Sequence, residues 1–503
     1  MFVFSHLIPT PHHLHLHHIS RIGRRSFQKY SIRINSSRLP YCQSSLPTNP
    51  HLRTLSPTPS QPLIRSRAFR PAPLAFVSYR SSSNSTTSRL SSPLISCHLS
   101  LVAALVFTIV VVGGLTRLTE SGLSITEWNL VSGILPPLSD ESWQSEFEKY
   151  RSTPEWRLLN HSITLHQFKT IYYWEWAHRL IGRIIGLSFL IPLPFLMRSG
   201  AVKGQKVRWS LCGIGTLIGA QGALGWYMVQ SGLDQLELDR RDGIPRVSQY
   251  RLAAHLLMAF GLYASCLRLA GGIWRDWKVG MEGQPLAGRQ KGLTAMESIN
   301  FLQSGIPSRA RVIIAGLTGL IMLTATSGAF VAGLDAGLVY NTFPKMGEQW
   351  APPISELISD TYSSRLGSTS QFGWLRNFFE NPTTVQFNHR ILAGLTFCTT
   401  LGTFTFVNRH RNLLPVSTLH FARGMMAMAA VQVGLGISTL VYLVPTGLAA
   451  AHQAGSLLLL TLSLGTGLSL RRPSPQALNA LKQLIAKSSS RSILPQSMVK
   501  TTN

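Results

Sequence analysis

Aspartate and glutamate are absent from the chain until Glu120. The segment 1–96 carries 12 arginine and lysine residues without one acidic residue, and it is rich in serine and proline. This composition is typical of a mitochondrial transit peptide, and the compact apolar core and small-residue cleavage site of a secretory signal are missing. We therefore predict that residues 1–96 are a mitochondrial targeting segment without a stable fold.

Cysteine is also scarce. Five cysteines occur in 503 residues, and no two of them form a CxxC motif. Cys42 lies in the targeting segment, and the others fall within or at the ends of apolar stretches: Cys97, Cys212, Cys266 and Cys398. This usage supports neither a structural zinc site nor a disulfide framework.

Charged residues make up only 13% of the chain, whereas soluble domains average about a quarter. The formal net charge of +27 comes from the targeting segment and from short loops between apolar stretches. No basic helix with interleaved aromatic side chains is present, so we predict no nucleic-acid partner. The composition favours a membrane protein whose surroundings are lipid.

Eight apolar stretches are long enough to cross a bilayer, whose hydrocarbon core of about 30 Å requires about 20 residues of helix. Several of them are rich in glycine. Small residues let membrane helices approach closely, as helices that surround a flat ligand must. The stretches lie at about 97–118, 171–197, 207–230, 248–270, 310–334, 384–407, 418–443 and 446–470.

The loops between these stretches alternate in charge. The loop at 198–208, the loop around Arg409 and Arg411, and the tail from Arg471 are basic. The loops on the other side carry the acidic residues Glu120, Glu127, Asp140, Glu141, Glu146, Glu148, Glu155, Asp234, Glu237, Asp239 and Asp242. The positive-inside rule therefore places the basic side and both termini in the matrix, for a multi-pass protein of the mitochondrial inner membrane.

An internal repeat divides the apolar region into two halves. A shift of 211 positions overlays the motif of His178 on that of His389, and a shift of 197 overlays His255 on His452. Each copy contains an even number of stretches, so both enter the membrane in the same direction and a pseudo-two-fold axis along the membrane normal is expected.

The predicted fold is thus an all-α membrane protein with eight transmembrane helices in two tandem four-helix bundles. Residues 97–270 form the N-terminal half and residues 310–470 the C-terminal half. We expect a matrix loop at 271–309 between them and a basic matrix tail at 471–503.

Two pairs of histidines recur at equivalent positions, His178 with His389 and His255 with His452. Within each half they lie on the second and fourth stretches, about 6–12 Å inside the membrane, and can face each other across the bundle. Two neutral imidazoles across a gap suit axial ligation of haem iron. The alternative is hydrogen bonding between helices, which four matched positions make less convincing. We predict that His178 and His255 ligate one haem, and that His389 and His452 ligate another.

An arginine directly follows the first histidine of each pair, Arg179 in one half and Arg390 in the other. An arginine near the membrane surface can bind a haem propionate through two parallel hydrogen bonds. It can equally extend its side chain towards water without a ligand. The sequence leaves both interpretations open, and we include Arg179 and Arg390 among the candidate haem-binding residues.

The halves differ three residues before these histidines, where Glu175 precedes His178 and Gln386 precedes His389. This spacing puts Glu175 and His178 on one helix face. A carboxyl group inside a membrane is costly, and beside a haem ligand it is a candidate for proton transfer. Pairing with an arginine is its structural alternative. We predict that Glu175 is catalytic, that the first haem is chemically transformed, and that the second carries electrons or braces the fold.

Four motifs resemble those of haem A synthases, and the similarity covers about 97–470. They are Phe168-Lys169 with Tyr172-Tyr173-Trp174-Glu175-Trp176-Ala177-His178-Arg179, Gly113-Gly114-Leu-Thr-Arg117-Leu-Thr-Glu120-Ser-Gly122, Asp335-Ala-Gly337 with Asn341-Thr342-Phe343-Pro344, and Phe387-Asn388-His389-Arg390. Some bacterial members have a cysteine pair in the first outer loop, and this chain has none there.

The resemblance implies that the C8 methyl of haem O is oxidised to a formyl group, which gives haem A for cytochrome c oxidase. It implies that His178 and His255 bind the substrate haem, that His389 and His452 bind haem B, and that Glu175 is the essential glutamate. It further implies ferredoxin and ferredoxin reductase as electron donors, haem O synthase as a neighbour in the membrane, and a homo-oligomer.

Two other functions fit parts of the pattern. A di-haem cytochrome b that only transfers electrons accounts for the four histidines, but it gives no reason for a carboxyl at Glu175 opposite Gln386. A transporter built from two repeats predicts broken helices around a site at the membrane midplane, whereas the distinctive residues here gather near one surface.

Overall fold

The computed structural model describes residues 90–491 except 130–131, 235–244, 283–296, 298, 301, 303–304 and 364–372. The predicted targeting segment lies outside the described residues up to position 89. So do the acidic residues Glu237, Asp239 and Asp242 of one outer loop, and the end of the predicted tail beyond residue 491.

Regular structure in the described residues is helical, apart from one isolated bridge between Met346 and Gln349. Each of the eight predicted stretches coincides with a long helix, and four of them extend one or two residues beyond it. These helices are α2 (Pro93–Leu118), α5 (Leu165–Leu190) with its continuation α6 (Pro192–Arg198), α7 (Gln205–Gly232), α9 (Gln249–Glu282), α11 (Gly305–Gly333), α15 (Pro382–Arg409), α16 (Val416–Val441) and α17 (Thr446–Ser469).

Short helices lie between the long ones or after them. They are η1 (Ser132–Ile134), α3 (Asp140–Arg151), α4 (Pro154–Leu158), η2 (Ala336–Leu338), α12 (Ile354–Leu357), α13 (Asp360–Ser363), η3 (Gly373–Arg376), α14 (Asn377–Glu380) and α18 (Pro475–Arg491). The segments from α3 to α4 and from α12 to α14 each precede a long helix that carries a candidate haem ligand.

Seven of the described helices are long and apolar enough to cross a membrane. The all-α, multi-pass membrane fold predicted from the sequence is therefore confirmed. Helix α7 is not among the seven, although its 28 residues are sufficient in length. Its glycines lower its apolar character: Gly213, Gly215, Gly219, Gly222 and Gly225.

Local sequence defines both ends of α5, the helix of His178. Thr164 and Gln167 form a reciprocal capping box at its start, in which each side chain accepts from the backbone N–H of the other. Near its end, Pro192 has no backbone N–H to donate to the preceding turn, so the helix is interrupted after Leu190 and α6 follows.

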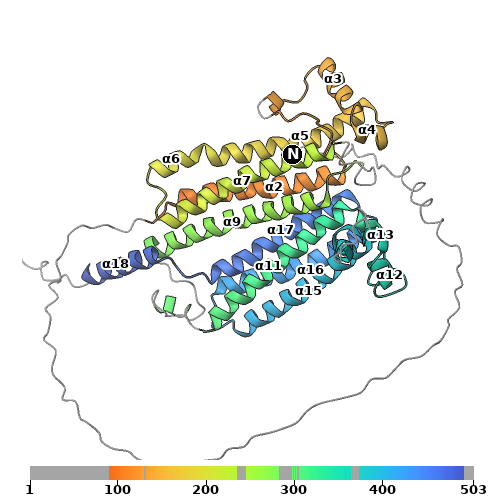
Figure 1. Cartoon of the computed structure of the whole chain (residues 1–503). Helices are drawn as coiled ribbons and strands as arrows, with labels where there is room; N and C mark the ends of the chain where they lie inside the picture. The colour runs from red at the N-terminus through yellow and green to blue at the C-terminus, as the bar shows by residue number, and fades with distance from the viewer. Residues whose placement is uncertain are drawn as a thin grey trace, which may run out of the picture. The chain divides into compact units, whose positions relative to one another are not determined.

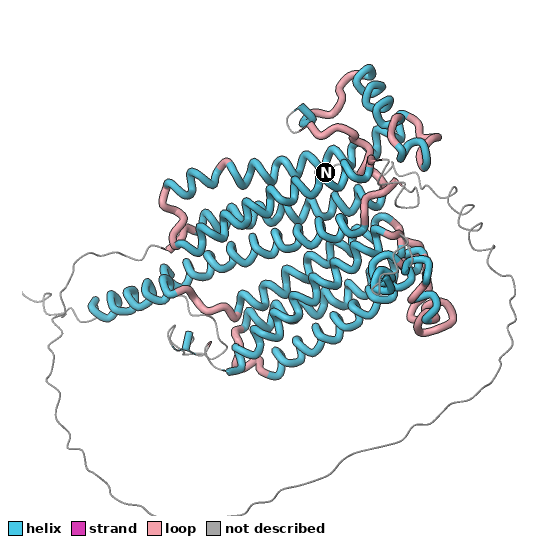
Figure 2. The backbone as a smooth tube through the Cα atoms, viewed as in Figure 1, coloured by secondary structure: helices cyan, strands magenta, loops and turns pink. Residues whose placement is uncertain are grey.

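The long helices pack into two groups of four in chain order, seen side by side in Figure 1. In the first group, α2 and α7 each contact both α5 and α9; in the second, α11 and α16 each contact both α15 and α17. The loops gather at the two ends of the helices (Figure 2). The groups meet where α9 and α2 contact α17, and where α9 contacts α11.

A single apolar core crosses this boundary, with buried residues of both groups in one cluster. Hydrogen bonds cross it as well. Gln453 Nε2 donates to the carbonyl of Val110 at 3.0 Å, and the hydroxyls of Tyr263 and Thr461 lie 2.8 Å apart. The side chain of Gln453 lies against Gly114, where a Cβ would collide with its Oε1. The boundary is thus closely packed.

The predicted loop at 271–309 and the predicted tail are both partly helical. Helix α9 continues past residue 270 to Glu282, and α11 already begins at Gly305. Helix α18 packs against α9, with Leu481 buried beside Val279. Asp276 of α9 also accepts hydrogen bonds from Arg471 and from the backbone of Ser474. These contacts anchor the beginning of the tail to the extended end of α9.

We expect Gly114→Ala to destabilise the protein, because the new methyl group would displace Gln453 from a packed boundary. Overpacking of this kind costs about 1–3 kcal/mol. Thermal unfolding of the protein in detergent measures the effect. Gly213→Ala is the matched control, since nothing lies within 4 Å of its Cβ position. The cost should largely vanish in a Gln453→Ala background, and an equal cost there would contradict the packing argument.

Candidate functional site

The imidazoles of His178 and His389 each pack against a glycine of the preceding long helix. A Cβ at Gly113 would lie 2.7 Å from Cε1 of His178, and a Cβ at Gly328 would lie 3.2 Å from Cε1 of His389. Any side chain at these positions would displace the ring. The absence of a side chain therefore determines where each imidazole lies.

His255 and His452 show the same arrangement on α9 and α17. Their Cε1 atoms lie 3.4 and 3.0 Å from the Cβ positions of Gly225 and Gly436. A glutamine one turn earlier on the glycine-bearing helix donates to the carbonyl of each histidine, from Gln221 to His255 at 3.2 Å and from Gln432 to His452 at 3.0 Å.

The pairing of the histidines follows the two helix groups. His178 lies within electrostatic range of His255, and His389 lies within range of His452. The Nδ1 atoms of His178, His255 and His452 are buried without a hydrogen bond, whereas Nδ1 of His389 lies 2.7 Å from the hydroxyl of Ser327.

These residues fit a haem in each group. In each group two imidazoles lie within electrostatic range of each other, and each of them lies against a bare glycine. The described part of the chain holds no cluster of three or more histidine, cysteine or acidic side chains that could bind a metal ion. A bis-histidine haem needs no such cluster, since the porphyrin supplies the other four ligands.

Arg179 holds the loop that follows α2. It donates from Nη2 to the carbonyl of Ile125 at 2.8 Å and from Nη1 to the carbonyl of Glu127 at 2.7 Å. Its Nη2 and Nε also donate to Oε1 of Glu175, at 2.6 and 3.1 Å. The guanidinium group thus joins the helix of His178 to the loop that covers it.

The carboxylate of Glu175 is buried, with 3% of the residue exposed. Its second oxygen accepts from the hydroxyl of Ser124 and from the backbone N–H of Ile125, both at 2.8 Å. Together with the two bonds from Arg179, four donors face one carboxylate. Such a set replaces the hydrogen bonds that the buried carboxyl group would otherwise make with water.

The second group contains an equivalent arginine clamp, in which Arg390 binds loop carbonyls as Arg179 does, but no carboxylate among the described residues is paired with it. Arg390 donates to the carbonyls of Tyr340, Thr342 and Lys345 in the loop after α11. Gln386 donates from Nε2 to the carbonyl of Tyr340 at 3.1 Å, and its Oε1 is buried without a partner. The one clear chemical difference between the two arrangements is the acid.

The candidate residues from the sequence are therefore brought together as two matched sets, but their contacts were only partly foreseen. Arg179 and Arg390 bind loop carbonyls, and Arg179 also pairs with Glu175. Propionate binding by either arginine remains a prediction. The contacts of Ser124 and Ile125 were missed, because no periodic pattern marks the side chains or backbone groups of an irregular loop. The contact of Ser327, which lies within α11, was missed because the sequence does not show which side chain of a neighbouring helix meets His389.

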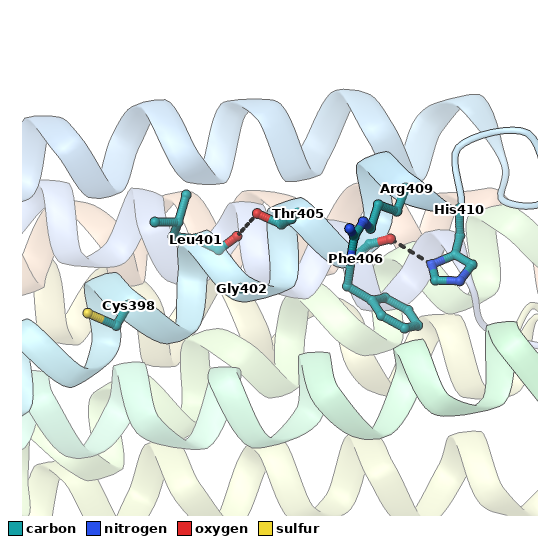
Figure 3. Close-up of a pocket in the computed structure, with 7 residues that line it drawn as sticks. All are labelled: Cys398, Leu401, Gly402, Thr405, Phe406, Arg409 and His410. Atoms are coloured by element: carbon teal, nitrogen blue, oxygen red, sulfur yellow. Dashed lines mark hydrogen bonds between the residues drawn. The ribbon is translucent and has the colours of Figure 1, made fainter.

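A pocket on the outer face of α15 lies apart from these residues. It is lined by seven side chains of α15 and its C-terminal cap: Cys398, Leu401, Gly402, Thr405, Phe406, Arg409 and His410 (Figure 3). His410 is the cap, with Nδ1 2.9 Å from the carbonyl of Phe406. None of the candidate haem ligands lines this pocket.

The fold is that of a helical, multi-pass membrane protein with a matched pair of histidines in each of its two helix groups. The model of the family described as cytochrome oxidase assembly protein (COX15-CtaA) matches residues 97–464. The chain therefore belongs to this family.

Curated relatives share the name of an enzyme. Heme A synthase COX15 of Saccharomyces cerevisiae is 42% identical over 402 residues, which cover 80% of each chain. Heme A synthase COX15 of Homo sapiens is 47% identical over 365 residues, which cover 72% of this chain and 79% of the relative. A Heme A synthase-mitochondrial ferredoxin fusion protein of Schizosaccharomyces pombe is 44% identical over 366 residues, covering 72% of this chain and 57% of the fusion.

We expect Arg179→Gln to destabilise the protein strongly, because it leaves the buried carboxylate of Glu175 without a counter-ion. Removal of one partner from a buried ion pair costs about 3–5 kcal/mol. Thermal unfolding provides the measurement, with Arg390→Gln as the matched control that opens the same clamp without stranding a charge. The double variant Arg179→Gln/Glu175→Gln should recover part of the loss, and no recovery would show that the charge is not the cause.

Proposed function

We propose that the protein is a haem A synthase, which oxidises the C8 methyl group of haem O to the formyl group of haem A. Family membership and the shared name of the relatives support this function. The observation that carries it is the buried carboxylate of Glu175, three residues before His178, in a position where the second group has Gln386. The conversion replaces two methyl hydrogens by one oxygen, so C–H bonds must break at the site, and a carboxylate nearby can accept a proton there.

The substrate haem would be held by His178 and His255, and haem B by His389 and His452. The glycines beside the four rings support both assignments. When bound, haem iron supplies the one-electron chemistry that no side chain of this chain provides. The chain itself contributes two axial imidazoles to each haem and an apolar, glycine-lined space between helices.

Glu175 would accept a proton released near the substrate and pass it on. A carboxylate with four donors is well positioned, because its oxygens are fixed by Ser124, Ile125 and Arg179. Arg179 would then hold the loop over the site whether or not Glu175 carries a proton, through its bonds to the carbonyls of Ile125 and Glu127. We also propose that Arg179 and Arg390 each bind a haem propionate.

The membrane arrangement follows from the same features. We infer eight crossings, α7 included, in two bundles related by a pseudo-two-fold axis along the membrane normal, with halves at 97–270 and 310–470. The matched glycine, glutamine and arginine contacts of the two groups support this symmetry. The basic residues of 198–208 and of the tail support a location in the mitochondrial inner membrane with both termini in the matrix, and residues 1–96 would be the transit peptide.

A ferredoxin is the electron donor that the comparisons favour, because one relative is named as a fusion with a mitochondrial ferredoxin. The basic loop with Lys203, Lys206 and Arg208 would face such an acidic partner. Ferredoxin reductase, haem O synthase and a second copy of this chain complete the proposed set of partners.

A di-haem cytochrome b is the weaker alternative. It would use all four histidines. Electron transfer alone, however, gives no reason for an ionisable carboxyl at Glu175 where the second group has the amide of Gln386. Extraction of the bound pigments separates the two functions, since the enzyme should contain haem O or haem A beside haem B.

We expect Glu175→Gln to keep both haems and to abolish formyl formation, because the amide preserves the shape but cannot accept a proton. Haem A output is measured by chromatography of extracted haems after expression with a haem O source. General acid–base groups contribute about 10²–10⁴-fold to rate. Gln386→Glu is the control and should leave the output unchanged. Wild-type output from Glu175→Gln would remove Glu175 from the mechanism.

We expect the histidine variants to separate the two sites. His178→Leu and His255→Leu should lose mainly the substrate haem, because leucine leaves one axial position of that iron empty. His389→Leu and His452→Leu should lose haem B. Reduced-minus-oxidised difference spectra and pigment extraction report which haem is missing, and loss of the same haem from all four variants would contradict the assignment.

A further inference from the structure

The imidazole ring of His389 is in contact with a hydroxyl group of the neighbouring helix. Ser327 lies on α11 directly before Gly328, the glycine against which the ring packs. Its Oγ lies 2.7 Å from Nδ1 of His389, and it also donates to the carbonyl of Thr324, three residues earlier, at 2.7 Å. Ser327 therefore joins this candidate haem ligand to the backbone of α11.

The two contacts of Ser327 determine which nitrogen of His389 carries the proton. A serine hydroxyl has one hydrogen to donate, and a carbonyl oxygen can only accept. Both contacts are hydrogen bonds at the same time only if the hydroxyl donates to the carbonyl of Thr324 and accepts from Nδ1–H of His389. The other nitrogen of a neutral imidazole then has a free lone pair, so Nε2 is the atom that can bind a metal ion.

The first group lacks this hydrogen bond. The residue before its glycine is Val112, whose side chain can neither donate nor accept, and Nδ1 of His178 is buried without a hydrogen bond. A backbone carbonyl lies near the ring in both groups, that of Ile109 for His178 and that of Thr324 for His389. The side-chain hydroxyl is therefore what distinguishes the surroundings of His389.

Further hydroxyl groups join α11 to α15 at the next turn. The hydroxyl oxygens of Thr324 on α11 and Thr396 on α15 lie 2.7 Å apart. The equivalent residues of the first group are Ile109 and Ile185, which pack in the apolar core. The hydroxyl of Ser327 is thus part of a polar contact between two helices, where the first group has aliphatic side chains. This contact fixes α11, and Ser327 with it, relative to the helix of the candidate ligand.

A hydrogen bond at the outer nitrogen of a metal-bound imidazole changes the ligand. It fixes the orientation of the ring and raises its basicity. A more basic axial ligand stabilises ferric iron more than ferrous iron, and hydrogen bonding of this kind is one of the ways in which a protein sets the reduction potential of a haem. The bond from His389 to Ser327 therefore acts to lower the potential, and a haem of lower potential is a stronger electron donor.

We propose that Ser327 is a positioning residue for the second haem, which keeps the proton of His389 on Nδ1, leaves Nε2 to the iron and lowers the reduction potential of haem B. The inference rests on the proposed function, in which His389 and His452 bind haem B, and deepens it. A lowered potential favours electron transfer over bracing of the fold as the role of this haem. Ser327 acts through His389 and is not itself an iron ligand.

The test measures the midpoint potential of haem B in the purified full chain, by redox titration of its absorption band. Ser327→Ala and Ser327→Val should raise the midpoint, because the ring loses its acceptor, and Ser327→Thr should keep it near the wild-type value. The matched control is Thr326→Val, which removes the neighbouring hydroxyl of α11, one that donates to the carbonyl of Met322 at 2.8 Å. This control should leave the midpoint unchanged.

The content of haem B is measured beside the potential, by pigment extraction. Hydrogen-bond partners of metal ligands contribute about 10–100-fold to metal affinity, so the alanine and valine variants should also retain less haem B. A merely structural role of Ser327 would lower this content without moving the midpoint of the haem that remains. An unchanged midpoint in both variants would overturn the proposal, as would an equal rise in Thr326→Val.

The reciprocal variant Val112→Ser decides the case in which the serine variants retain no haem B at all. It offers a hydroxyl to Nδ1 of His178 and should lower the midpoint of the haem in the first group, and an unchanged midpoint there would overturn the proposal. If the wild-type chain itself contains no haem B, the proposed function fails instead, and the two failures are thereby distinguished.

Discussion

The contact between an imidazole ring and a bare glycine backbone is the constraint on which the site depends. It occurs four times, and in each case the glycine belongs to a neighbouring helix of the same group. A histidine inside a membrane needs a fixed orientation if its Nε2 is to face a ligand, and a ring pressed against a helix backbone has little freedom to rotate. On α7 this position is Gly225, which lies against His255.

The arginine clamps add a second constraint at the membrane surface. Each clamp ties the helix of a candidate haem ligand to the loop after the preceding long helix, through carbonyls of Ile125 and Glu127 in one group and of Tyr340 and Thr342 in the other. Loop carbonyls near lipid need donors, because water is scarce there. An arginine with five donors satisfies several carbonyls at once, and in the first group it also neutralises the buried acid.

Much of this arrangement could be predicted from the sequence, for reasons that individual residues make clear. The long helices were predictable because apolar length is a direct physical requirement of a bilayer. The two histidine pairs were predictable because the repeat aligns them. The continuation of α9 to Glu282 was not, because this end of the helix is stabilised by packing of Val279 on Leu481, a contact between distant segments. The burial of Glu155 in α4 escaped prediction for the same reason, since a short helix shows no pattern that reveals what covers it.

The packing also connects the two histidine pairs. Gly113 lies against the ring of His178, and the next residue, Gly114, lies against the side chain of Gln453. Gln453 in turn follows His452 and donates to the carbonyl of Val110. Two consecutive residues on α2 and two on α17 therefore join a candidate ligand of one group to a candidate ligand of the other. A closely packed boundary yields little to compression, so a shift of α17 at His452 would displace α2 at His178. The equivalent positions on the opposite side, Leu256 and Ala329, are both apolar, so they do not repeat the hydrogen bond of Gln453.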